Sequence, residues 1–149
     1  GVTMSEAMGY AAEVLKQCMP TFAELGVQLA LEPLGPEEGD FLRTADLAVE
    51  LMEMIDSPPC RLHLDVKAMS TEDQPIDEII RKHAEHMIHF HANDANRRGP
   101  GMGDIDFVPI LQALKDINYD GWVCVEVFDY EPGVEALAKE SIDYLKSCV

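Results

Sequence analysis

The sequence predicts an α/β fold in which helices cover a parallel sheet, and two observations lead to this prediction. Four short runs of apolar and β-branched residues are each followed by a longer stretch with apolar residues at helical spacing. Each run also ends in an acidic or histidine side chain. These ends are 33, 26 and 35 residues apart, which is about the length of one βα unit.

The first predicted elements are a helix and a strand. Thr3 and Glu6 have the spacing of a capping box, which marks a helix start, and Gly26 is expected to end the helix. Pro20 is expected to kink or split this helix, because proline lacks the N–H that the helical ladder needs. The run over residues 27–32 has strand character.

The rest of the chain repeats the order strand then helix. Strands are predicted over residues 61–65, 87–91 and 122–127. Helices are predicted near residues 41–55 and 75–83, after Asp106 as N-cap, and from Glu131-Pro132 onward. Gly99, Gly101 and Gly103 form a loop that is expected to be a flexible turn, with a phosphate site as the alternative.

Composition favours one soluble domain over residues 1–149. The chain is 47% hydrophobic and 26% charged, and no linker or low-complexity segment interrupts it. Its formal net charge of -17 argues against nucleic-acid binding. It has no leader and no apolar run long enough for a membrane span, and its four cysteines form no C-x-x-C pair. We therefore expect a cytoplasmic protein that binds neither nucleic acid nor membrane.

Polar side chains close the four predicted strands, and they are Glu32, Asp65, His91 and Glu126. Because parallel strands point the same way, all four side chains should emerge at one edge of the sheet, where α/β barrels hold their active sites. Three carboxylates and an imidazole at one edge favour a bound divalent cation. Oxygen-rich ligation with one nitrogen suits Mn²⁺ or Mg²⁺, with Zn²⁺ and Co²⁺ as alternatives.

Five short motifs give the chain its resemblance to a known family. They are Leu31-Glu32-Pro33-Leu34, Leu62-His63-Leu64-Asp65, His89-Phe90-His91-Ala92-Asn93-Asp94, Pro100 to Asp106, and Tyr119-Asp120-Gly121-Trp122 leading to Glu126. Together they resemble the xylose isomerase-like TIM barrel enzymes, and within them the sugar or sugar-phosphate isomerases and epimerases that include ketose 3-epimerases. The resemblance covers nearly the whole chain and implies strands five to eight of the barrel.

The resemblance also implies roles for individual residues. Glu32, Asp65, His91 and Glu126 match the four metal ligands, and the two glutamates match the acid/base pair that flanks the reacting carbon. Glu38 and Arg97 match substrate-binding residues. Ala68 stands where related epimerases often have a histidine, and the neighbouring Lys67 is expected to supply a charge to the substrate instead. His63 and His89 are expected to support the site rather than to bind the ion.

The implied reaction is proton abstraction next to a carbonyl, through an enediolate that the metal stabilises. The expected substrate is a small sugar or sugar phosphate. A dehydratase of a keto-polyol could use the same site. Two other functions are less favoured. A DNA-repair endonuclease that cuts abasic sites would need more histidine ligands and a basic groove, and the remaining alternative is a non-catalytic homologue. Since a complete barrel has eight strands and about 250 residues, we expect a missing N-terminal half-barrel or a second chain as partner.

Overall fold

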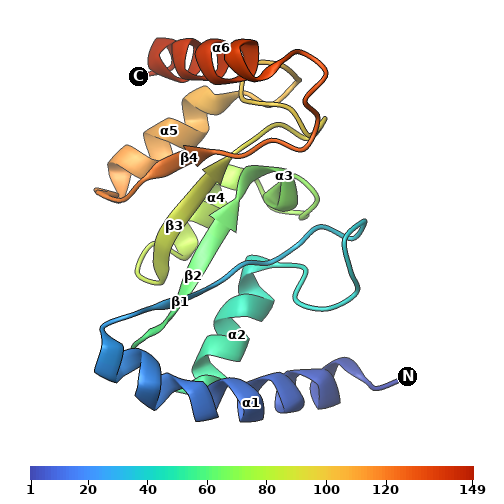
Figure 1. The fold of residues 1–149 in the computed structure, drawn as a ribbon, viewed down its shortest axis with the longest axis vertical. Coiled ribbons are helices and arrows are strands. Elements are labelled where there is room, and N and C mark those ends of the chain that lie inside the picture. The colour runs from blue at the N-terminus through green and yellow to red at the C-terminus, as the bar shows by residue number, and fades with distance from the viewer.

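A computed structural model describes residues 1–149, and it contains four strands and six helices (Figure 1). In chain order these are α1 (Met4–Leu25), β1 (Leu29–Leu31), α2 (Ala45–Ile55), β2 (Cys60–Asp65), α3 (Val66–Met69), α4 (Ile76–Lys82), β3 (Met87–Ala92), α5 (Phe107–Asp116), β4 (Val123–Val125) and α6 (Val134–Ser147). The predicted order of strands and helices is confirmed. The short helix α3, which directly follows β2, was not predicted.

The four strands form one parallel sheet in the order β1-β2-β3-β4. Leu31 is level with Leu62, Asp65 with His91, and His91 with Cys124. This register places the ends of β2 and β3 side by side. The parallel sheet with covering helices, as in part of a TIM barrel, confirms the predicted fold class.

The ends of α1 agree with the sequence signals. Thr3 accepts from the backbone N–H of Glu6, and the Glu6 carboxylate accepts from the backbone N–H of Thr3, so the capping box is complete. Gly26 ends the helix in the left-handed conformation, with φ at 64°. Pro20 was predicted to kink or split the helix, and it does not split it, because α1 continues through Pro20 to Leu25. The side chain of Pro20 is exposed, so its ring is accommodated outside the core.

Two other boundaries differ from the predictions. The edge strands β1 and β4 have three residues each, so Glu32 and Glu126 follow their strands instead of lying within them. Helix α6 begins at Val134, after Gly133 at φ 89°, rather than at Glu131-Pro132. The Glu131 side chain is paired with Arg98, which holds this segment against the loop after β3.

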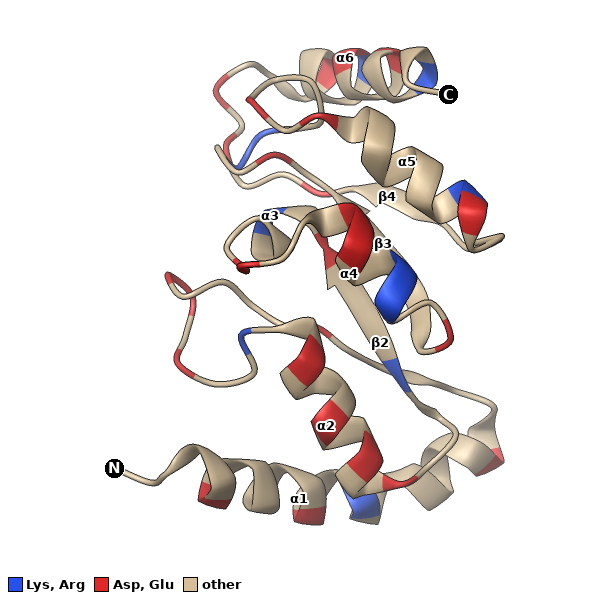
Figure 2. Cartoon of the chain, turned by 180° about the vertical axis from the view of Figure 1, so that it is seen from behind, with Lys and Arg blue, Asp and Glu red and all other residues tan.

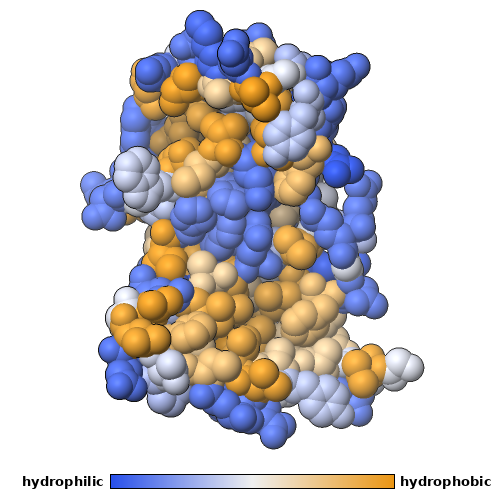
Figure 3. Space-filling view, viewed as in Figure 1, coloured by the Kyte–Doolittle hydropathy of each residue, from blue (hydrophilic) through white to orange (hydrophobic).

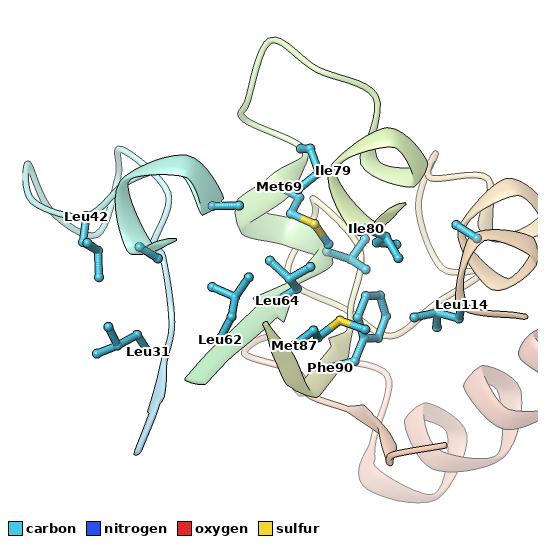
Figure 4. Packing of buried hydrophobic residues seen from close by; sticks show 14 of the residues in the cluster. Leu31, Leu42, Leu62, Leu64, Met69, Ile79, Ile80, Met87, Phe90 and Leu114 are labelled. Atoms are coloured by element: carbon cyan, nitrogen blue, oxygen red, sulfur yellow. The ribbon is translucent and has the colours of Figure 1, made fainter. Parts of the chain in front are cut away.

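The outward face of the sheet packs against the helices and forms the core. Leu62, Leu64 and Phe90 have no exposed surface, and Ile79 and Ile80 of α4 are also buried (Figure 4). Side chains of a strand alternate between its faces, so the intervening His63, Asp65, His89 and His91 lie on the opposite, inner face. These polar side chains of β2 and β3 thus lie on the face of the sheet that would line a barrel.

The surface combines acidic helices with apolar patches. Acidic residues lie on α1, α2 and the loops (Figure 2). In the view of Figure 3, a hydrophilic band crosses the middle of the molecule and hydrophobic residues lie above and below it. Helix α1 exposes Tyr10, Val14 and Leu25, which are 58%, 60% and 68% exposed. No helix has the length and apolar character that crossing a membrane requires.

Candidate metal centre

The four predicted ligands meet at the carboxyl-terminal edge of the sheet. One ligand atom from each of Glu32, Asp65, His91 and Glu126 lies within 4.8 Å of all the others. Nδ1 of His91 is central to them: it is 3.1 Å from Glu126 Oε2, 3.8 Å from Asp65 Oδ2 and 3.9 Å from Glu32 Oε1. The strand ends therefore converge as the sequence predicted.

Asp65 is the most firmly held of the four. It is the last residue of β2 and the N-cap of α3, and its Oδ1 accepts a hydrogen bond of 2.8 Å from the N–H of Ala68. Its Oδ2 accepts a 2.6 Å bond from Nδ2 of Asn93. The residue is only 3% exposed, so one carboxylate is fixed in the centre before any ion binds.

A divalent cation fits the donors of this cluster. Nδ1 of His91 is buried and makes no hydrogen bond of good geometry, although three carboxylates surround it. A buried polar atom without a partner is costly, and three facing carboxylates repel one another unless a positive charge lies between them. Three carboxylates and one imidazole are ligands that Mn²⁺ or Mg²⁺ accepts.

Glu32 shows the electrostatic cost of the metal-free arrangement. Burial, followed by the charges of Asp65, Glu126 and Glu38, raises the pKa of its carboxyl group from 4.5 to about 7, while Lys67 acts in the opposite direction. A carboxylate whose charged form is so disfavoured gains the most from a bound cation. Perturbed carboxyl groups of this kind concentrate at functional sites.

The three predicted substrate-binding residues line one hollow beside this cluster. Glu38, Lys67 and Arg97 line a cavity of about 390 Å³. Glu38 and Lys67 also line a smaller cavity of about 140 Å³, which they share with Glu32, Asp65 and Glu126. Nζ of Lys67 lies 2.8 Å from Oε2 of Glu38, so the two side chains form an ion pair at the junction of the cavities.

Two further side chains belong to this region, and of these Phe128 was not predicted from the sequence. Asn93 is fully buried and bonds to both Asp65 and the N–H of Lys67, so it joins β3 to the turn after β2. Phe128 lines the smaller cavity, and the cationic groups of Lys67 and Arg97 lie 5.2 and 5.7 Å from its ring centre. Asn93 lies in the motif His89 to Asp94, which predicts that it lines the site or caps the loop, and the structure places it beside Asp65.

The glycine-rich loop contains a turn at residues 100–101, as predicted, and packs closely on its neighbours. A Cβ atom at Gly99 would lie 1.9 Å from Oγ of Ser141 in α6, and one at Gly103 would lie 2.0 Å from Oδ1 of the buried Asp94. The glycines thus permit this close packing, and the flexibility of the turn stays a prediction.

Comparisons with known proteins identify the family of the chain. A family model described as the xylose isomerase-like TIM barrel matches residues 1–148. The D-psicose 3-epimerase of Enterocloster bolteae is 33% identical over 123 residues, which are 83% of this chain and 41% of that protein. A probable ketose 3-epimerase of Synechocystis sp. is 28% identical over 160 residues, covering 97% of this chain and 53% of that protein.

A solved structure of an epimerase has the same fold as this chain. The crystal structure of a D-psicose 3-epimerase in the presence of D-fructose matches 97% of this chain with a TM-score of 0.82 and 28% identity, and the match covers 49% of that chain. The chain therefore spans about half the length of the relatives it matches. On its sequence and its fold, the chain belongs to the xylose isomerase-like TIM barrel family.

Proposed function

We propose that this chain is part of a sugar epimerase, which depends on a divalent metal ion and acts on a small ketose or ketose phosphate. The observation that carries the proposal is the convergence of Glu32, Asp65, His91 and Glu126 within 4.8 Å, in a chain whose relatives bear the name ketose 3-epimerase. Those names favour epimerisation over dehydration of a keto-polyol, a reaction that would use the same residues.

The proposed roles follow from position and chemistry. Glu32 and Glu126 extend from β1 and β4, the two ends of the four-stranded sheet, and approach the centre from opposite sides. Two carboxyl groups on opposite faces of a substrate carbon can remove a proton from one face and return one to the other, which inverts that carbon. A metal ion bound between them would stabilise the negative charge that develops on the adjacent substrate oxygen.

Substrate binding is assigned to the adjoining hollow. Lys67 and Glu38 offer a charged donor and a charged acceptor to sugar hydroxyl groups, and Arg97 adds a second cation at the rim. Phe128 provides an apolar surface on which a sugar ring can pack. The larger cavity, of about 390 Å³, is in the range of small-molecule sites.

We further propose that residues 1–149 are the C-terminal half of a barrel domain and act with a second half, on the same chain or another. Strands β1 and β4 each have one paired edge, and parallel strands are normally covered on both sides. The exposed apolar side chains of α1 would be covered by a preceding βα unit. The relatives, about twice as long, support this assignment.

Exchange of carbon-bound hydrogen with solvent tests the function. The protein with both halves of its barrel would be loaded with Mn²⁺ and incubated with D-psicose or D-fructose in D₂O. Hydrogen exchange would be followed by NMR and loss of water by mass spectrometry. The account expects exchange that falls in both Glu32→Gln and Glu126→Gln but not in Glu85→Gln, whose side chain is 83% exposed. Loss of water would favour the dehydratase. A folded, Mn²⁺-loaded protein that contains both halves of the barrel and exchanges no hydrogen would contradict the proposal.

A further inference from the structure

A second group of ligand atoms lies directly below the candidate metal centre on the inner face of the sheet. His63 precedes Asp65 by two residues and His89 precedes His91 by two, so each lies one layer deeper on the same face. His63 and His89 are level in adjacent strands. Together with His91 they form a cluster of three imidazoles, with one nitrogen of each within 4.8 Å of the other two.

The three rings meet edge to face. The ring centres are 4.1 Å apart for His63 and His91, and 4.9 Å apart for His63 and His89 and for His89 and His91. His63 is 6% exposed, and its Nε2 atom has no hydrogen-bond partner. The only carboxylate within 4 Å of its other nitrogen is Glu32, with Oε2 at 3.7 Å from Nδ1.

Packing alone does not account for this cluster. Buried polar atoms nearly always have a partner, and an apolar side chain at position 63 would fill the same space without an unsatisfied nitrogen. Three imidazoles that converge, two of which have a buried nitrogen without a hydrogen bond, are in contrast a ligand set for a transition metal.

We propose that His63, His89 and His91 form a second metal site that binds a borderline transition-metal ion such as Zn²⁺ through nitrogen alone. Imidazole ligands suit Zn²⁺, Ni²⁺ and Cu²⁺, whereas Mn²⁺ and Mg²⁺ prefer the oxygen-rich centre above. Because His91 belongs to both groups, a Zn²⁺ ion held by the three imidazoles withdraws one ligand from the carboxylate centre. The carboxylate centre would thus bind the harder ions Mn²⁺ and Mg²⁺, and the adjacent histidine layer would bind softer ions such as Zn²⁺.

Zinc binding after removal of the carboxylates separates the two sites. Isothermal titration calorimetry with Zn²⁺ would use the chain carrying Glu32→Gln and Glu126→Gln, which disable the upper centre. In this background the proposal expects one Zn²⁺ per chain with micromolar affinity and no detectable Mn²⁺ binding. Adding either His63→Asn or His89→Asn should lower Zn²⁺ affinity by at least about tenfold. Adding His86→Asn, at a histidine outside the cluster, should not.

The outcomes are distinguishable from those of the proposed function. Absence of Zn²⁺ binding in the doubly substituted chain overturns the proposal of a second site. It does not bear on the proposed function, which rests on the carboxylate centre of the wild-type chain. Zn²⁺ binding that neither histidine substitution weakens also overturns it, since Asp65 and His91 alone would then hold the ion. Circular dichroism would check the fold of each variant. His63 is buried, so His89→Asn decides the result if His63→Asn unfolds the chain.

Discussion

Nδ2 of Asn93 donates a hydrogen bond of 2.6 Å to Oδ2 of Asp65, and both side chains are buried. Oδ1 of the same amide accepts from the N–H of Lys67 at 2.8 Å. One side chain directly after β3 thus fixes both the Asp65 carboxylate at the end of β2 and helix α3, which carries Lys67. The candidate metal centre and the adjoining hollow share this support.

Replacing Asn93 with Ala should therefore weaken metal binding without removing a ligand. The substitution frees the Asp65 carboxylate to rotate, and we expect Mn²⁺ affinity to fall by about 10–100-fold in calorimetry. Asn96→Ala is the matched control, because Asn96 is an exposed amide of the following loop that bonds to the backbone of Met102. Unchanged affinity in a folded Asn93→Ala chain would show that Asp65 does not depend on this bond.

Glu32→Gln should stabilise the metal-free chain at neutral and higher pH. The pKa of the Glu32 carboxyl is raised to about 7 by burial and by its acidic neighbours. The unfolded chain therefore releases this proton near pH 4.5 and the folded chain near pH 7, so the wild type loses stability as the pH rises through this window. With EDTA at pH 8, urea unfolding should show a gain of about 1–2 kcal/mol for Glu32→Gln, allowing for solvent screening.

Wild type and Glu32→Gln also test the direction of this pH dependence of stability. Below pH 4.5 the Glu32 carboxyl is protonated in both states, so the difference in unfolding free energy should disappear. With saturating Mn²⁺ at pH 8 the order should reverse, since only the wild type retains the full ligand set. A Glu32→Gln chain that is no more stable than wild type at pH 8 without metal would contradict the electrostatic description of the centre.

Lys67→Met should separate substrate binding from metal binding. The ammonium group of Lys67 pairs with Glu38 at 2.8 Å, and its charge lowers the pKa of Glu32. Removing it should lower the affinity of the Mn²⁺-loaded chain for D-fructose by about tenfold or more. Mn²⁺ affinity should rise slightly, because a repelling cation is gone. Lys139→Met, at a lysine whose side chain is 78% exposed, should change neither value, and equal effects of both variants would argue against a substrate role for Lys67.

The contact of Gly99 with Ser141 predicts a coupled pair of substitutions. Gly99→Ala should cost about 1–3 kcal/mol in urea unfolding, because the added methyl group would collide with the buried Oγ of Ser141. Ser141→Ala removes that oxygen, which has no hydrogen-bond partner, and should recover part of the loss. A double-mutant cycle with a coupling energy of about 0.5 kcal/mol or more confirms the contact. Additive costs would show that the loop relaxes away from α6.

The sequence predicted those features that depend on local pattern. Glu32, Asp65, His91 and Glu126 were found because each follows an apolar run, and a parallel sheet brings such ends together whatever the details of its loops. The capping box at Thr3 and the N-cap at Asp106 were also predicted, since a side chain bonds to a backbone group only two or three residues away.

Features that depend on tertiary contact were not predicted. The close approach of Gly99 to α6 joins residues that are far apart in the chain, and spacing within the loop gives no sign of it. The sequence placed Asn93 near the site, but its bond to Asp65 depends on the pairing of β2 with β3. The contact of His63 with His89 likewise depends on the strand register. The later start of α6, after Gly133 at φ 89°, was also not predicted.

Calorimetric titration of the chain with Mn²⁺, for wild type, Glu126→Gln and the control Glu85→Gln, tests the central claim most directly. The account predicts one Mn²⁺ per wild-type chain with micromolar affinity, a loss of about tenfold or more for Glu126→Gln, and no change for Glu85→Gln. Folded wild-type chain that binds no Mn²⁺, or that binds it equally well after Glu126→Gln, would contradict the four-ligand centre.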